Sequence, residues 1–483
     1  MAWTLAQIEP HSTPSSCWVI IQNHVYDVTE FLAEHPGGAA IILKYAGRDA
    51  TQVYEPIHPK DTLQKHLPSS KHLGPLDVTA TSTLAQARDS QQKTKDELRV
   101  EAAKGNRPPL SRILSLADLE AVAKATIPHK AWSYYSSASD DEISFRENER
   151  AFSRFFFRAR VLRAVSWCDP STTILGYKSS LPVFVSGAAL AKLAHPLGEL
   201  NITRASGAAS IIQMVSSNSS FSAPEIAAAA LPSQVLFFQL YKHRNDAIAA
   251  QRVRDIENLG YKAIFLTVDA VVPSNRERDI RSPWELEDIE TGVPPVYEEG
   301  PEAQDGSGLG TAGALIMNDD RDMTWEKTIP WLRSVTRLPI VLKGVQCVED
   351  ALLAAQAGVD GILLSNHGGR QLEYALPPME VLYRLRKDHP EVFSKLEVYL
   401  DGGVRRGTDI IKALCLGAKA VGLGRPFLYA QGAYGEAGVT KLIRILEREM
   451  TTGMRLLGAS TTHDLTPDLV ERVDWQPQLR SKL

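Results

Sequence analysis

The chain has 483 residues, of which 44% are hydrophobic and 23% are charged, and its formal net charge is -4. This length excludes a single small binding module, and the composition excludes a wholly disordered protein. The near balance of 53 Lys and Arg against 57 Asp and Glu lacks the basic field that a general nucleic-acid binder needs. No apolar stretch reaches the roughly 18 residues of a membrane span. The four scattered cysteines form no metal-binding pair, so we expect reduced thiols.

Residues 1–76 form the first unit that the sequence predicts. Residues 18–28 alternate between apolar and polar side chains, as a pair of strands does, and an apolar helical stretch follows. His35 precedes Pro36 and two glycines, where a helix has to end. A single histidine at such a position is usually an ordinary helix cap.

The segment VYDVTEFLAEHPGG resembles the cytochrome b5-type haem domain, and the resemblance extends over this whole unit. It implies a small α+β domain that binds haem b through His35 and through His58, which lies in YEPIHPKD. Because two imidazoles leave the iron no open position, such a haem transfers electrons and does not bind oxygen.

Residues 77–110 differ in composition from what precedes and follows them. They contain few large apolar side chains and many Ser, Thr, Gln and charged residues, so they cannot bury a core. We expect a solvated linker with one short helix around residues 93–104. A second irregular stretch, residues 281–318, is acidic and rich in Gly and Pro, and we expect a surface loop near the working face of the next domain.

Residues 111–475 contain eight short apolar runs, each followed by a segment with helical periodicity. Continuous apolar runs suit strands that are buried on both faces, and repeated strand and helix units indicate a parallel sheet. Eight such units favour a closed (β/α)8 TIM barrel over an open doubly wound sheet. The predicted fold is therefore α/β, a barrel preceded by the small α+β domain. The runs are residues 181–190, 209–216, 234–241, 263–270, 338–345, 359–368, 397–404 and 420–427.

Polar residues are concentrated at the predicted carboxyl ends of these strands, where a barrel of this type has its active site. Each has a simple structural explanation when it is taken alone: Asp269 can cap the next helix, and Gln239 can satisfy a loop carbonyl. Their joint occurrence at equivalent positions indicates a site. The residues are Ser216, Gln239, Tyr241, Thr267, Asp269, Lys343, Asn366, His367, Arg370, Asp401, Arg405 and Arg425.

Glycines and arginines follow the last two strands, in DGGVRRG and GLGRP. Barrels commonly bind phosphate here, so this pattern predicts a phosphorylated ligand, although two tight glycine turns would look similar. Lys343 is suited to stabilise an anion on an aromatic cofactor. Arg370 and His367 offer a carboxylate clamp and a proton acceptor. Together they suggest flavin mononucleotide (FMN) that oxidises a 2-hydroxy acid.

The motifs AWSYYSSASDDE, LTVDA, LPIVLKGV, SNHGGRQLE, DGGVRRGTD and GLGRPFLYA resemble those of the FMN-dependent 2-hydroxy acid oxidising enzymes. The resemblance implies that His367 is the base that acts at the substrate Cα–H, and that Asp269 supports its protonated form. It also implies a group of residues that contact the substrate. These are Arg370 and Tyr134 at the carboxylate, Tyr241 on the hydroxyl side, and Arg276 near substrate and flavin.

The same resemblance assigns a second group of residues to FMN. Lys343 would face flavin N1 and stabilise the reduced anion. Ser216, Gln239 and Thr267 would hold the isoalloxazine and ribityl edges. The ribityl and phosphate groups would contact Asp401, Gly403, Arg405, Gly424 and Arg425.

Two positions depart from the family pattern. Ala188 replaces a frequent threonine, and Asn218 stands where relatives usually carry a bulkier apolar or aromatic residue. Both positions lie beside the expected substrate pocket. A roomier and more polar pocket weakens the assumption that lactate is the substrate.

The fusion of a haem domain to a flavin barrel resembles the flavocytochrome b2 group. It implies that electrons from an L-2-hydroxy acid pass from FMN to haem b and then to an external acceptor such as a c-type cytochrome. An oxidase that passes electrons to oxygen and makes hydrogen peroxide is the alternative. An electron carrier on a barrel that only binds FMN or another phosphate would suit a chain without His367 or Arg370, and both are present. Relatives are commonly tetramers, so we expect a homotetramer.

Residues 476–483 form a tail that ends in Ser481, Lys482 and Leu483. A terminal Ser-Lys-Leu is a peroxisomal address. The N-terminal residues resemble neither a secretory signal nor a mitochondrial presequence. We therefore expect a peroxisomal enzyme, with the cytoplasm or the mitochondrion as alternatives.

Overall fold

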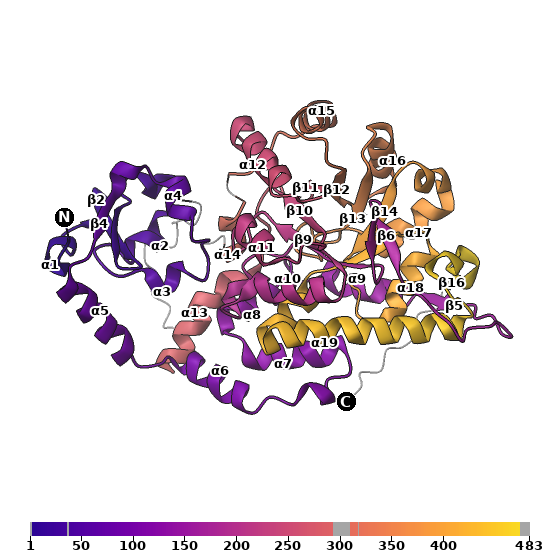
Figure 1. Ribbon diagram of the computed structural model, residues 1–483, viewed down its shortest axis with the longest axis horizontal. Coiled ribbons are helices and arrows are strands. Elements are labelled where there is room, and N and C mark those ends of the chain that lie inside the picture. The colour runs from indigo at the N-terminus through magenta and orange to yellow at the C-terminus, as the bar shows by residue number, and fades with distance from the viewer. Residues whose placement is uncertain (1, 36–37, 293–309, 317, 474–483) are drawn as a thin grey trace.

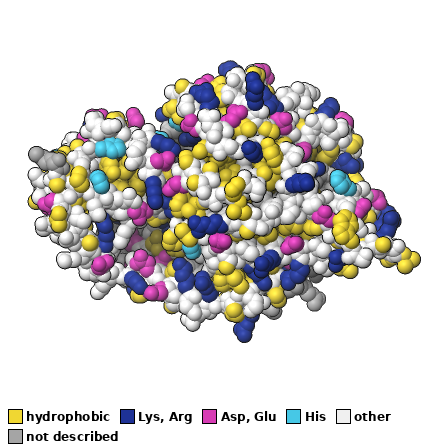
Figure 2. Space-filling model, in the orientation of Figure 1, with side chains coloured by type: hydrophobic (Ala, Val, Ile, Leu, Met, Phe, Trp, Pro, Cys, Tyr) yellow, Lys and Arg dark blue, Asp and Glu magenta, His cyan; other side chains and the backbone are white. Residues whose placement is uncertain are grey.

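The computed structural model describes residues 2–35, 38–292, 310–316 and 318–473. A small N-terminal lobe lies beside a much larger barrel, and two linker helices run along one side of the molecule from one to the other (Figure 1). Basic and acidic side chains are interspersed over the face that Figure 2 shows. In the described part of the chain, no helix is both long and apolar enough to cross a membrane.

The small lobe is built on a four-stranded antiparallel sheet with strand order β1-β2-β3-β4. The turn between β2 and β3 consists of Gln22 and Asn23, both with positive φ, as a two-residue hairpin requires. Side chains of β2 alternate between two apolar clusters, since Val19 faces one and Ile20 the other. The strands are β1 Ser12–Thr13, β2 Ser16–Ile21, β3 His24–Asp27 and β4 His72–Pro75. The helices are α1 Leu5–Ile8, α2 Ala39–Leu43, α3 Thr51–Tyr54 and α4 Thr62–His66.

The segment between the lobes contains two helices, α5 Val78–Ser90 and α6 Lys95–Gly105, one more than the sequence predicts. Each begins with a capped turn: Asp77 accepts a hydrogen bond from the Ala80 amide, and Thr94 accepts one from the Glu97 amide.

The two helices are attached to different lobes. Arg88 of α5 forms an ion pair of 2.6 Å with Asp49 of the small lobe. The backbone N–H of Lys95 in α6 donates a hydrogen bond of 3.0 Å to Glu290 of the barrel domain. The exposed residues 91–94 join the two helices.

The large lobe is a closed barrel of eight parallel strands, in the order β10-β11-β12-β13-β14-β15-β8-β9. Each predicted apolar run contains one of these strands, so the predicted (β/α)8 barrel is confirmed. The strands are β8 Val183–Val185, β9 Ile212–Ser216, β10 Leu236–Leu240, β11 Ile264–Thr267, β12 Ile340–Val345, β13 Gly361–Leu364, β14 Glu397–Asp401 and β15 Ala420–Leu423.

Aromatic rings fill the inside of the barrel. Phe184, Phe237, Phe265 and Tyr399 are all fully buried and contact one another, so the barrel is a packed core and not a pore. Ile174 from a hairpin, β6 Thr172–Ile174 and β7 Tyr177–Ser179, joins this cluster.

Helices surround the barrel (Figure 1). They pack the apolar outer faces of the strands into one extended core. They are α10 Gly198–Ala208, α11 Ala223–Ala229, α12 Asp246–Asn258, α15 Trp325–Val335, α16 Val348–Gln356, α17 Pro378–Asp388, α18 Gly407–Cys415 and α19 Arg425–Leu457. Three helices precede the barrel, α7 Leu116–Thr126, α8 His129–Ser136 and α9 Ile143–Phe152, and β5 Phe155–Phe157 pairs with β16 Val470–Arg472.

The expectation of an irregular loop from residue 281 is wrong for its first part. Helix α13 spans Glu277–Thr291, and a short helix α14 spans Gly310–Ala314; residues 293–309 lie outside the described residues. Although α13 contains Pro283, it packs along α8 and α6. These tertiary contacts stabilise a helix that its local composition disfavours.

Candidate functional site

A cavity opens at the carboxyl ends of the barrel strands, with about 1250 Å³ of space that protein atoms do not fill. Most of the predicted site residues line it, although they come from segments far apart in the sequence. They are Tyr134, Ser216, Tyr241, Arg276, Lys343, His367, Arg370, Asp401, Gly403, Arg405, Gly424 and Arg425. Gln239, Thr267 and Asp269 do not line the cavity. Gln239 and Asp269 are hydrogen-bonded to the lining residues Ser216 and His367, and Thr267 is hydrogen-bonded to Gln239.

The imidazole of His367 is oriented by contacts on both of its nitrogens. Nδ1 donates a hydrogen bond of 2.9 Å to Oδ1 of Asp269, whose side chain is fully buried. The Tyr241 hydroxyl donates one of 3.3 Å to Nε2. The Lys343 ammonium lies 3.8 Å from Oδ2 of Asp269. Nε2 is therefore the nitrogen that is available on the cavity side.

The electrostatics of this group favour a neutral imidazole beside an ionised carboxylate. Burial and the Lys343 charge lower the pKa of His367 to about 4, although Asp269 acts in the opposite direction. Burial opposes ionisation of Asp269, but Lys343 and His367 outweigh it and lower its pKa. At neutral pH the imidazole is thus ready to accept a proton, and Asp269 is placed to stabilise the imidazolium that forms.

Backbone geometry at two positions makes this arrangement possible. His367 has φ of 57°, in the left-handed region that non-glycine residues seldom adopt, and its N–H donates to Ser365 Oγ at 3.0 Å. A Cβ at Gly344 would lie 2.4 Å from Cγ of Asp269, so only glycine lets strand β12 pass so close. Ser365 and Gly344 lie within the quoted motifs SNHGGRQLE and LPIVLKGV, but the sequence pattern indicated no role for either.

Two arginines and a tyrosine form the cationic wall of the cavity. The Arg370 guanidinium lies 5.9 Å from the ring centroid of Tyr134, and within the described residues its Nε has no hydrogen-bond partner. Arg276 donates to the Arg370 carbonyl at 3.2 Å. Burial and the charge of Arg370 lower the pKa of Arg276 to about 10. The buried Arg276 and the half-buried Arg370 together attract a small carboxylate, which a guanidinium binds in a bidentate manner.

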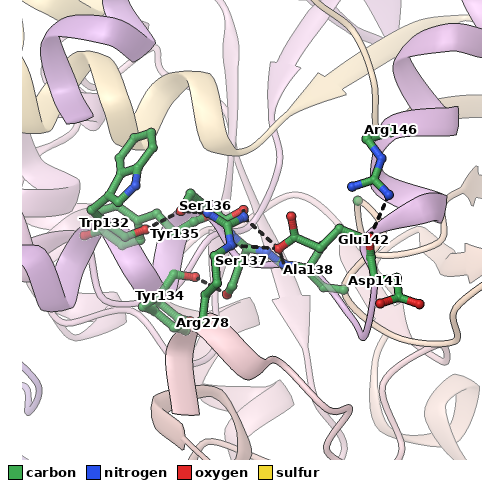
Figure 3. Close-up of polar contacts among 12 residues, drawn as sticks. Trp132, Tyr134, Tyr135, Ser136, Ser137, Ala138, Asp141, Glu142, Arg146 and Arg278 are labelled. Atoms are coloured by element: carbon green, nitrogen blue, oxygen red, sulfur yellow. Dashed lines mark hydrogen bonds and ion pairs between the residues drawn. The ribbon is translucent and has the colours of Figure 1, made fainter. Parts of the chain in front are cut away.

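Figure 3 shows the polar contacts that hold the C-terminal end of helix α8, the helix that carries Tyr134. Arg278 of α13 donates to the Ser136 carbonyl at 2.8 Å and to Oε1 of Glu142 at 2.7 Å. Glu142 in turn accepts a hydrogen bond of 3.0 Å from the Ala138 amide. Nothing in the sequence indicated this clamp, because it joins segments that are more than 130 residues apart.

The two departures from the family pattern lie where the sequence placed them. Ala188 and Asn218 both line the cavity. Asn218 Nδ2 donates a hydrogen bond of 3.2 Å to the carbonyl of Leu315, which follows α14 and also lines the cavity.

The remaining polar residues fit a flavin nucleotide. Ser216 donates to Gln239 at 2.9 Å, and Gln239 donates to Thr267 at 2.8 Å, so these three side chains form one connected row. Asp401 accepts from Ser186 at 3.1 Å, while its buried Oδ1 has no partner within the described residues. An unpaired buried acceptor in a cavity suits a ligand hydroxyl such as those of a ribityl chain.

Arg405 and Arg425 reach the expected phosphate end, and both already have protein partners. Arg405 forms an ion pair with Glu120, which the sequence did not predict. Burial and the charge of Arg370 lower the pKa of Arg425 to about 9. Arg425 donates hydrogen bonds of 2.9–3.0 Å to the backbone carbonyls of Tyr135, Ser137 and Gly368.

His35 and His58 of the small lobe face each other across a gap. Their ring centroids are 6.2 Å apart, which leaves room for one iron with a metal–nitrogen distance of about 2 Å on each side. The Nδ1 atoms are bonded to the carbonyls of Gly38 at 3.0 Å and Tyr54 at 3.1 Å, so both Nε2 atoms remain for the metal. Burial lowers the pKa of both histidines, which favours the neutral, ligating form. The pair fits haem iron; Pro36 and Gly37 lie outside the described residues.

Two family models match the chain, one for each lobe. The model of the FMN-dependent dehydrogenase family matches residues 123–472. The model of the cytochrome b5-like haem/steroid binding domain matches residues 4–77. Together they account for both sites.

Relatives share this architecture. The L-lactate dehydrogenase (cytochrome) of Wickerhamomyces anomalus is 43% identical over 469 residues, which are 96% of this chain and 79% of the relative. The flavin-binding domain of baker's yeast flavocytochrome b2 superposes with a TM-score of 0.71 at 42% identity, covering 79% of this chain and 92% of that one.

The expected peroxisomal location is wrong. The peroxisomal (S)-2-hydroxyacid oxidase of Arabidopsis thaliana, 39% identical, covers 74% of this chain and 96% of its own length. The cytochrome-type relative covers 96% of this chain, haem domain included. The chain therefore groups with the cytochrome-type enzymes and not with the peroxisomal oxidases. Ser481, Lys482 and Leu483 lie outside the described residues.

The two matches also explain why one polypeptide holds both a cavity suited to a flavin nucleotide and a facing pair of neutral histidines. The chain belongs to the FMN-dependent dehydrogenase family, as a member that binds FMN in its barrel and haem in a cytochrome b5-like domain.

Proposed function

We propose that the protein oxidises an L-2-hydroxy acid such as lactate to the 2-oxo acid, and passes the electrons through its haem to a one-electron acceptor such as a c-type cytochrome. The observation that supports this most strongly is the hydrogen-bonded pair of His367 and Asp269, because His367 lines the same cavity as Arg370. The two facing histidines of the small lobe favour a one-electron acceptor, because a haem with two histidine ligands transfers electrons and does not bind oxygen.

The substrate carboxylate is held by Arg370, with Arg276 and the Tyr134 hydroxyl beside it. This anchoring places the substrate Cα–H and hydroxyl near Nε2 of His367, which takes up a proton, while the Tyr241 hydroxyl contacts the substrate oxygen. Asp269 then stabilises the imidazolium. FMN, when bound, accepts the two electrons of the acid, and haem relays them one at a time.

The FMN-binding residues are proposed from their positions at the cavity or directly beside its lining residues. Ser216, Gln239 and Thr267 would hold the isoalloxazine and ribityl edges of FMN, and Lys343 would stabilise negative charge on its ring. The ribityl and phosphate groups are bound by Asp401, Gly403, Arg405, Gly424 and Arg425.

The domain limits are proposed as a haem domain of residues 1–76, a linker of residues 77–110, a flavin domain of residues 111–475 and a tail of residues 476–483. A homotetramer of this chain is proposed as its assembly.

The side chain of the substrate acid is proposed to lie toward Ala188 and Asn218, which line the cavity. Acids larger than lactate are then accepted as well.

Mixing the purified holoenzyme anaerobically with an L-2-hydroxy acid tests the proposal. We expect the flavin to be reduced first and the haem next, and added ferricytochrome c to be reduced in turn. Assays with lactate and with longer and aromatic L-2-hydroxy acids identify the preferred acid. An oxidised haem, together with hydrogen peroxide formed in stoichiometric amounts under air, would instead show an oxidase.

A further inference from the structure

Lys192 connects the flavin barrel to the haem domain. It lies in η4, Ala191–Leu193, in the loop that follows strand β8. Its Nζ donates a hydrogen bond of 3.1 Å to the backbone carbonyl of Glu55. That carbonyl is at the end of helix α3, where carbonyls lack partners within the helix, and it is three residues before the proposed haem ligand His58.

The barrel holds Lys192 in the orientation that this contact needs. Its backbone N–H donates to Ser220 Oγ at 2.9 Å. The N–H groups of Ser220 and Ala191 donate to Oε1 of the buried Glu199 at 2.8 and 3.1 Å, which joins the loops after β8 and β9. The Lys192 ammonium also lies 4.4 Å from the ring centroid of Phe221. The side chain is therefore ordered by the barrel before any contact with the haem domain.

An apolar contact lies next to this hydrogen bond. Ile57, the neighbour of His58, packs against a buried cluster of the barrel domain that includes Tyr134, Leu190 and Leu428. Tyr134 and Leu428 also line the cavity of the proposed flavin site. A residue next to the haem ligand thus packs against the same side chains that form part of the cavity wall.

We propose that Lys192 and Ile57 form the docking contact that holds the haem domain in the position for electron transfer from the barrel. Lys192 is a positioning residue in this proposal, which rests on the proposed function. The covalent connection alone does not fix the haem domain, because α5 is bonded to the small lobe, α6 is bonded to the barrel, and only the exposed residues 91–94 join them.

Three substitutions test the docking contact in the full-length holoenzyme. Lys192→Met removes the hydrogen bond from the barrel side, and Ile57→Ala removes packing from the haem side without touching the flavin loops. Lys60→Met is the matched control, since Lys60 is an exposed lysine two residues after His58. Lys192→Arg keeps the donor and should restore the wild-type behaviour.

Two measurements separate docking from catalysis. In anaerobic stopped-flow mixing with L-lactate, Lys192→Met and Ile57→Ala should leave flavin reduction unchanged and slow haem reduction roughly tenfold, which corresponds to about 1.4 kcal/mol. Hydrogen exchange of residues 51–66, followed by mass spectrometry without substrate, should be faster in both variants and unchanged in Lys60→Met.

Wild-type haem reduction and wild-type exchange in Lys192→Met would overturn the docking contact. An equal fall in flavin and haem reduction would also overturn it, because Lys192 would then act on the flavin loop. A wild-type enzyme that reduces its flavin and never its haem would refute the proposed function itself, which is a different result from either of these.

Discussion

Replacement of Asp269 by Asn removes one negative charge behind the proposed catalytic base and leaves the side-chain volume nearly unchanged. Asp269 is fully buried, accepts the 2.9 Å hydrogen bond from His367 and lies 3.8 Å from the Lys343 ammonium. In Asp269→Asn a neutral amide replaces the carboxylate as the hydrogen-bond partner of the imidazolium, and Lys343 has lost its anionic partner.

The size of the effect follows from the charge that develops during the reaction. A hydrogen bond to a charged group contributes about 1.5–3 kcal/mol, and loss of one partner from a buried pair costs about 3–5 kcal/mol. Only the part of this interaction free energy that increases as His367 gains its proton changes the rate. We therefore expect the barrier to rise by about 2–4 kcal/mol, which slows oxidation of the acid roughly 30- to 900-fold. KM should change little, because Asp269 does not line the cavity.

Stopped-flow reduction of the flavin by L-lactate, with and without deuterium at C2, measures this effect directly. We expect a slower reduction, a deuterium isotope effect at least as large as in the wild type, and an unchanged FMN content. A reduction rate within threefold of the wild type, or a higher KM at unchanged kcat, would refute the role of Asp269 as the support of the imidazolium.

Three further predictions follow. Because the neutral form of His367 is the base and its pKa is lowered to about 4, kcat/KM should be constant from neutral pH to about pH 5 and fall as the pH passes below about 4; a pH profile that declines already at pH 6.5 would contradict this. His58→Ala should abolish the haem spectrum and cytochrome c reduction while the flavin is still reduced by substrate, and absorbance spectroscopy with both assays checks this. Gly403→Ala should weaken FMN binding and lower the Tm. The φ of Gly403 is 82°, a conformation that costs an alanine backbone roughly 1–3 kcal/mol. The new Cβ would also lie 2.1 Å from the Asn148 carbonyl oxygen. Gly105→Ala, with no atom near the new Cβ, is the control, and equal behaviour of the two variants in calorimetry and FMN titration would contradict the steric argument.

The architecture followed from local pattern. Eight continuous apolar runs predict buried parallel strands because neither face of such a strand meets water. Since parallel strands end at the same edge, the sequence also predicts that His367, Lys343 and Asp401 share one cavity. His35 and His58 could likewise be proposed as haem ligands from a motif and a spacing. That their rings face each other is seen only in the structure.

The pairing of side chains was decided by tertiary structure. The Asp269 contact to His367, the Glu120 contact to Arg405 and the carbonyl cage around Arg425 join residues that are distant in the chain, and no local pattern contains them. Helix α13 shows the same dependence, because packing on α8 and α6 stabilises a segment whose composition predicts a loop. The sequence by itself determined which chemical groups gather at the end of the barrel. Only packing determined which nitrogen of His367 faces the cavity and where the haem domain rests. Both depend on distances between separate helices, strands and loops, and local sequence does not set those distances.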